Sequence, residues 1–141
     1  MKIAATISRV LLGLVFAVFG LNHFVGFIPH PEMAGAALDY MSGITATGYF
    51  WPFLRTLELL CGLALIFRFY PTLALFILTP ITLNIFLFHI FLEPVNIPMA
   101  AIMLLLNGFL VYWYWDYYKL IFTKSPLGLR ESSKSTSTKK A

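Results

Sequence analysis

Four long apolar stretches alternate with short polar or proline-containing segments along this chain of 141 residues. The stretches cover about residues 7–27, 50–69, 71–92 and 97–117. About 20 apolar residues in a helix suffice to cross the roughly 30 Å hydrocarbon core of a bilayer. The pattern therefore predicts an all-α protein, an integral membrane four-helix bundle in which each stretch crosses the membrane once.

Two further segments differ from the spans. In the connection over residues 28–49, which contains no Lys or Arg, Pro31 suits the first turn of a helix that Gly43 could end. We expect a short amphipathic helix over about 31–42, lying on the membrane surface. The last segment, 121–141, is basic, rich in Ser and Thr and without apolar periodicity, which predicts a disordered cytoplasmic tail after a membrane domain of residues 1–120.

Composition places the chain in the membrane class, because 60% of its residues are hydrophobic and only 11% are charged. The net charge of +4 comes mostly from basic residues near the two ends, and nothing in the sequence suggests nucleic-acid binding. The single cysteine, Cys61, excludes an intramolecular disulfide, a CxxC redox pair and a cysteine-rich metal site.

The basic residues predict the topology. Four spans place both termini on one side, and Lys2, Arg9, Arg68 and the lysines from Lys119 onward fall on that side. By the positive-inside rule this side is the cytoplasm, and we expect Arg9 to extend to its lipid headgroups. The sequence thus predicts a multi-pass protein with cytoplasmic N and C termini.

One stripe of the first span combines polar and small residues at i, i+4, i+7, i+11 and i+14. Its members are Arg9, Gly13, Phe16, Gly20 and His23. Residues at this spacing share a helix face, and glycine lets a second helix approach closely. We expect the stripe to face the other helices.

Charged residues inside the second span mark the candidate site. Arg55 and Glu58 are three residues apart, so they share one helix face and can neutralise each other. At 1.5 Å per residue they lie roughly 7 and 12 Å below the outer end of the span. Every other span adds polar residues to the middle or outer half, which gives the set Asn22, His23, Arg55, Glu58, Asn84, His89 and Asn107.

This polar layer has two interpretations. It is a ligand pocket open to the outer face, or a structural lock made of an ion pair and interhelical hydrogen bonds. In the pocket interpretation Glu58 accepts a proton or hydrogen bond from the ligand, Arg55 keeps Glu58 ionised, and His23 and His89 bond the ligand oxygens.

A haem held by His23 and His89 is a weaker alternative, because spacing does not show that both rings face one cavity. No other metal site is expected. Nucleotide-binding and serine-hydrolase motifs do not occur in the sequence, no catalytic residue can be assigned, and whether the protein is an enzyme stays open.

Four segments resemble the DoxX family of small bacterial membrane proteins. They are residues 9–16 (RVLLGLVF), 19–24 (FGLNHF), 58–63 (ELLCGL) and 80–89 (PITLNIFLFH). The resemblance extends over all four spans but not the tail, and it implies a four-helix bundle in a bacterial inner membrane. Some relatives are linked with quinone-coupled sulfur oxidation or with membrane oxidoreductase complexes, which implies a membrane or periplasmic oxidoreductase partner.

Three functions remain as hypotheses. The first is a quinone-binding or redox-linked subunit; because Cys61 has no partner, its electrons would come from a bound cofactor or another subunit. The second is a non-catalytic accessory or assembly protein whose polar layer is structural. The third and weakest is a small transporter, since four short spans without an obvious repeat would need a homo-oligomer to form a path.

Overall fold

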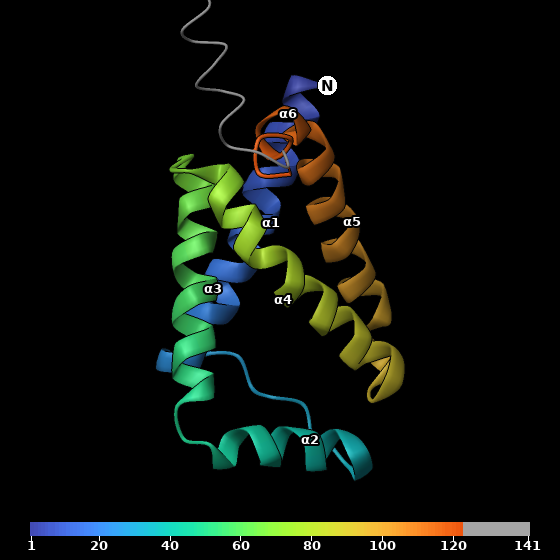
Figure 1. Cartoon of the computed structure of the whole chain (residues 1–141). Coiled ribbons are helices and arrows are strands. Elements are labelled where there is room, and N and C mark those ends of the chain that lie inside the picture. The colour runs from blue at the N-terminus through green and yellow to red at the C-terminus, as the bar shows by residue number, and fades with distance from the viewer. Residues whose placement is uncertain (123–141) are drawn as a thin grey trace, which may run out of the picture.

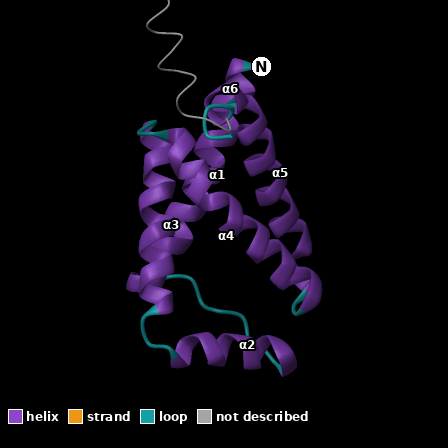
Figure 2. Cartoon of the chain, viewed as in Figure 1, coloured by secondary structure: helices purple, strands orange, loops and turns teal. Residues whose placement is uncertain are grey.

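The computed structural model describes residues 1–122, and these are helical throughout apart from turns and loops, with no strand among them (Figures 1 and 2). The helices are α1 (Lys2–Val25), α2 (Gly35–Ala46), α3 (Phe50–Phe67), α4 (Pro71–Phe91), the 3-10 turn η1 (Pro94–Asn96), α5 (Ile97–Trp113) and α6 (Trp115–Tyr118).

Four of these segments are long and apolar enough to cross a membrane, namely α1, α3, α4 and the continuous segment Pro94–Trp113. The predicted all-α class is thereby confirmed, as is the presence of four helical segments with the length and hydropathy of membrane spans. The expected tail lies outside the described residues from residue 123 onward.

The predicted bounds of the short helix are wrong at both ends. The helix begins only at Gly35, because the backbone at Ala34 is still extended, with a φ of −137° and a ψ of 162°. Gly43 lies inside α2 with open space where a Cβ would stand, so nothing there forces the helix to end. The chain turns instead at Gly48, whose φ of 74° is the left-handed conformation that glycine adopts readily. α2 lies across the end of the molecule opposite the N-terminus (Figure 1).

Glycines bring α1 and α3 into close contact. A Cβ added to Gly62 of α3 would lie 2.6 Å from the Ala17 nitrogen, and one added to Gly13 of α1 would lie 2.8 Å from the Gly62 oxygen. Gly20 meets the Arg55 oxygen in the same way, at 2.9 Å. Such contact between backbones is how small residues promote packing of membrane helices.

The predicted stripe of α1 is buried at Arg9, Gly13, Phe16 and Gly20, as expected, but not at His23. The last turn of α1 is covered on the Asn22 side by the loop that follows, and His23 lies outside that cover.

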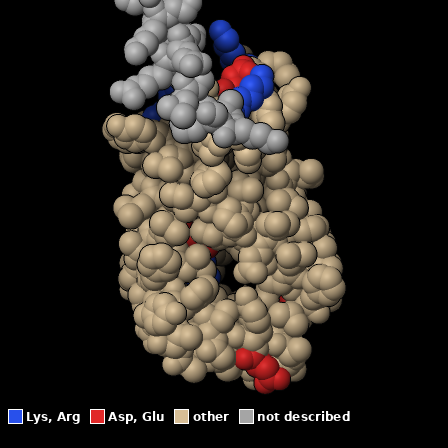
Figure 3. Space-filling model, viewed as in Figure 1, with Lys and Arg blue, Asp and Glu red and all other residues tan. Residues whose placement is uncertain are grey.

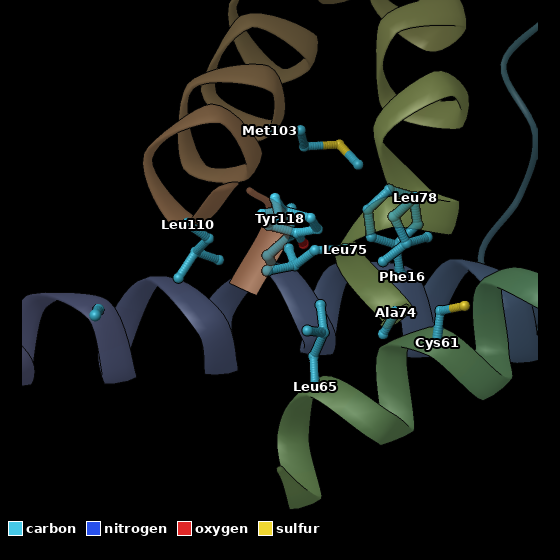
Figure 4. Close-up of a cluster of buried hydrophobic side chains, with 11 residues drawn as sticks. Phe16, Cys61, Leu65, Ala74, Leu75, Leu78, Met103, Leu110 and Tyr118 are labelled. Carbon is cyan, nitrogen blue, oxygen red and sulfur yellow. The ribbon is translucent and has the colours of Figure 1, made fainter. Parts of the chain in front are cut away.

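The hydrophobic core occupies one half of the molecule. It combines α1 as far as Phe16 and α4 as far as Leu78 with α3 from Cys61 onward and α5 from Met103 onward, and α6 adds Tyr118 (Figure 4). Its side chains are Ala5, Leu12, Phe16, Cys61, Leu65, Ala74, Leu75, Leu78, Met103, Leu110 and Tyr118. α1 packs chiefly on α3, and α4 chiefly on α5. Toward α2, the ribbons of α3 and α4 diverge (Figure 1). The half that carries α2 therefore has little of this core.

Candidate functional site

The two charges of α3 form the predicted ion pair. Arg55 Nη1 lies 2.6 Å from Glu58 Oε2, and the two side chains are 23% and 1% exposed. On its other side the guanidinium covers the indole of Trp51, with Cζ 5.1 Å from the ring centroid. Arg55 is thus held between a carboxylate and an aromatic face, which favours a cation at this depth.

The pair leaves hydrogen-bonding groups unused. It is a single contact, and within residues 1–122 the other N–H groups of Arg55 and the Oε1 atom of Glu58 have no hydrogen-bond partner in the protein. Polar groups away from water are nearly always hydrogen-bonded, to protein, water or ligand. The pair therefore presents both donors and an acceptor to whatever occupies the space beside it.

An opening lies on this side of the molecule. Figure 3 shows it between the diverging ends of α3 and α4, on the side toward α2, with acidic and basic atoms visible at its wall. Where α2 faces α4, a hollow of about 240 Å³ is lined by Tyr40, Asn84, Leu87, Phe88, Phe91 and Leu92. Among the described residues, neither the Tyr40 hydroxyl nor the Asn84 amide has a hydrogen-bond partner.

Asn22 and His23 are engaged at the end of α1. The Asn22 amide donates to the Ile28 oxygen at 3.1 Å and accepts from the Ile28 nitrogen at 2.6 Å, so it holds the loop after α1. His23 is exposed, and its ring meets the edge of Phe24 at 5.2 Å between centroids.

His89 and Asn107 also have partners of their own. His89 Nδ1 lies 2.7 Å from Glu93 Oε2, and Asn96 donates to both oxygens of the same carboxylate, which stabilises the turn into α5. The buried Asn107 lies across from α4, where its Oδ1 accepts from the Thr79 hydroxyl at 3.0 Å, while its Nδ2 has no partner among the described residues.

The seven predicted residues thus separate into groups. Arg55 and Glu58 come together, and Asn84 lines the hollow between α2 and α4. The remaining four make contacts at three other places: Asn22 and His23 at the end of α1, His89 with Glu93, and Asn107 with Thr79 of α4. In the part of the chain that the structure describes, no three His, Cys, Asp or Glu side chains gather closely enough to hold a metal ion.

The expectation for Arg9 is wrong. Arg9 is only 7% exposed, and its Nη1 donates to the Leu65 oxygen and, at 3.2 Å, to the Ile66 oxygen. The last carbonyls of a helix lack intrahelical partners, so Arg9 satisfies the end of α3 instead of extending to lipid headgroups. Its place on the Gly13 stripe was the signal for this role.

Two residues of the site were not among the candidates. Trp51 is one helical turn before Arg55, so its contact with the guanidinium could have been expected from the i, i+4 spacing. Tyr40 gave no such signal, because only the tertiary structure brings α2 beside α4.

Comparisons with family models, with curated proteins and with solved structures give no match to this chain.

Proposed function

We propose that this protein is a membrane subunit that binds a quinone head group beside Arg55 and Glu58. The observation that carries the proposal is the single-contact ion pair, whose remaining donors and Oε1 acceptor have no partner in the described protein although Glu58 is 1% exposed. A pair that served only to neutralise two charges within the apolar helix α3 would gain from a second hydrogen bond, as in bidentate arginine–carboxylate contacts.

A quinone matches the groups on offer. Its carbonyl oxygens accept hydrogen bonds, which the free N–H groups of Arg55 can donate, and the hydroxyl of the reduced form donates to an oxygen such as Glu58 Oε1. A carboxylate in this position is also suited to exchange a proton with the bound ring. Any electron transfer would use a partner oxidoreductase or a cofactor, since Cys61 is the chain's single cysteine.

The proposal includes a topology. The N-terminus and α6 lie at one end of the molecule and α2 at the other (Figure 1), and Lys2 and Lys119 belong to the first end whereas Asp39 belongs to the second. This charge asymmetry supports cytoplasmic N and C termini. Together with the resemblance to the DoxX family, it favours a four-helix bundle in a bacterial inner membrane, with the pair in the outer half.

Quinone binding to Glu58→Gln protein tests the proposal. In a Trp113→Phe, Trp115→Phe background, Trp51 is the single tryptophan and lies against Arg55, so a quinone beside the pair should quench its fluorescence. Because the amide loses the charge that strengthens the hydrogen bond, we expect Glu58→Gln to weaken binding by about 10-fold or more.

The matched control is Thr56→Val, which changes an exposed residue of the same helix whose hydroxyl bonds within α3. It should bind quinone as the parent does. Equal binding by parent and Glu58→Gln, or binding by neither, contradicts the proposal.

The burial of Glu58, which is 1% exposed, favours one alternative, an accessory protein in which the pair is purely structural. In that case Glu58→Gln lowers the melting temperature in detergent, while pull-downs of membrane partners and cellular redox phenotypes do not change.

A further inference from the structure

Helix α2 covers the hollow beside α4 at one end of the molecule. α2 lies across that end (Figure 1), and two contacts hold it there. The Tyr40 ring lies 5.4 Å from the Phe88 ring of α4, and Trp51 Nε1 of α3 donates to Thr45 Oγ1 of α2 at 3.0 Å. Ala37 of α2 is itself buried, at 3% exposed. α2 is therefore attached to both helices that border the opening.

The flank of the molecule, by contrast, is open. Figure 3 shows the opening in the side of the molecule, at the level of the apolar spans and above α2. Two residues that line the hollow also belong to the outer surface of α4, with Leu87 42% and Phe91 77% exposed. Since α4 is long and apolar enough to cross a membrane, this surface is suited to contact lipid tails. The wall of the hollow is thus continuous with that surface.

The lining has an amphiphilic character that points to the kind of molecule it takes. Four of its side chains are apolar, and two, Tyr40 and Asn84, carry hydrogen-bonding groups with no partner among the described residues. An unpaired amide at membrane depth costs free energy unless something bonds it. The occupant should therefore carry an oxygen next to an apolar part.

From these features we infer that the ligand enters sideways from the lipid between α3 and α4, and that it is a membrane-dissolved quinone whose apolar tail lies along Leu87 and Phe91. The inference rests on the proposed function and names its substrate class. The ring sits beside Arg55 and Glu58, the Asn84 amide and Tyr40 hydroxyl bond a second oxygen of the ligand, and the tail extends out along α4. A water-soluble quinone lacks the part that the apolar lining binds.

The experiment compares two probes, a decyl-tailed benzoquinone and the same ring without the tail, by quenching of Trp51 in the background described above. Two variants of α4 are matched. Leu87→Phe adds bulk inside the hollow, and Leu83→Phe adds the same bulk at a residue that is 46% exposed and does not line it. Detergent concentration is constant, so partition of the tail into micelles is the same for every variant.

We expect the decyl tail to improve binding to the parent protein by about 10-fold or more, as burial of several CH₂ groups predicts. Leu87→Phe should remove most of that advantage while the tailless probe binds as before, which also shows that the variant is folded. Leu83→Phe should keep it.

An advantage of the tail that is equal in parent, Leu87→Phe and Leu83→Phe overturns the sideways route, as does a tail with no advantage at all. If the tailless probe still binds in a manner that depends on Glu58, the proposed function survives that result. If neither probe quenches Trp51 in the parent, both proposals fail together.

Discussion

Arg9 and Arg55 are two arginines in apolar helices that pack against each other, but their hydrogen-bond partners differ. Arg9 is 7% exposed and donates to the Leu65 and Ile66 carbonyls at the end of α3. Arg55 is 23% exposed and makes one contact, to Glu58. The first lies beside the packed core, and the second belongs to the half of the molecule that has little of it.

The difference teaches how to distinguish a structural charge from one that can serve a ligand. A helix end needs donors, so an arginine there completes a hydrogen-bonding deficit that every helix has. A charge pair within a helix meets no such deficit, because the backbone groups around it are already bonded. Donors left over from such a pair are available to another molecule.

The largest expected effect on stability concerns the Arg55–Glu58 pair, in the half of the molecule that carries α2. Arg55→Leu leaves Glu58 buried without its partner, and we expect a loss of about 3–5 kcal/mol of unfolding free energy, because a lone buried charge is costly. The double variant Arg55→Leu, Glu58→Leu should recover most of the stability, since two apolar side chains replace the pair, but it should bind no quinone. Thermal unfolding in detergent and Trp51 quenching measure both. A double variant as unstable as the single one would mean that the ion pair itself stabilises the folded protein, as the hydrogen bonds of Arg9 do.

A smaller effect on stability is expected at Arg9, in the half of the molecule that holds the hydrophobic core. Arg9→Leu removes the donor of two carbonyls, and we expect a loss of about 1–3 kcal/mol with quinone affinity unchanged. Lys2→Leu, an exposed cation at the start of the same helix, is the control and should stay within about 0.5 kcal/mol of the parent. Weakened quinone binding in Arg9→Leu at temperatures where it is folded would remove the distinction between the two arginines.

The smallest effect near neutral pH is a pH dependence of stability, which also arises in the half that holds the hydrophobic core. Tyr118 donates to the Thr72 oxygen at 2.7 Å, and burial, with Tyr114 nearby, raises its pKa from 10.0 to about 12. Because the folded state binds this proton more tightly than the unfolded state, the stabilisation is complete below pH 10 and is lost as pH rises through about 12.

Tyr118→Phe should remove that part of the alkaline loss, whereas Tyr112→Phe, at a residue 74% exposed, should not. Melting temperatures from pH 9 to 12, with tyrosinate absorbance followed in parallel, provide the measurement. Identical dependence of the melting temperature on alkaline pH for the parent and Tyr118→Phe would show that the hydrogen bond of the Tyr118 hydroxyl does not stabilise the fold.

The sequence by itself determined the features that depend only on residues close together in the chain. Apolar runs long enough to span a bilayer predicted the four long helices, and the spacing of Arg55 and Glu58 predicted their ion pair. The glycine stripe of α1 was predicted to face other helices, and Gly13 and Gly20 do lie against α3. These features follow from hydropathy and helical periodicity, which are properties of single helices.

Only the tertiary structure decided which polar groups meet. Arg9 bonds a carbonyl 56 residues away, and Tyr40 reaches α4 from a helix whose start and end were both predicted wrongly. Similar depth in the membrane had suggested one polar layer, but the rotation of each helix about its axis sends Asn107 to Thr79 and leaves Asn84 at the hollow. Depth follows from counting residues along one helix, whereas rotation depends on how all the helices pack, so the pair could be predicted from sequence and its surroundings could not.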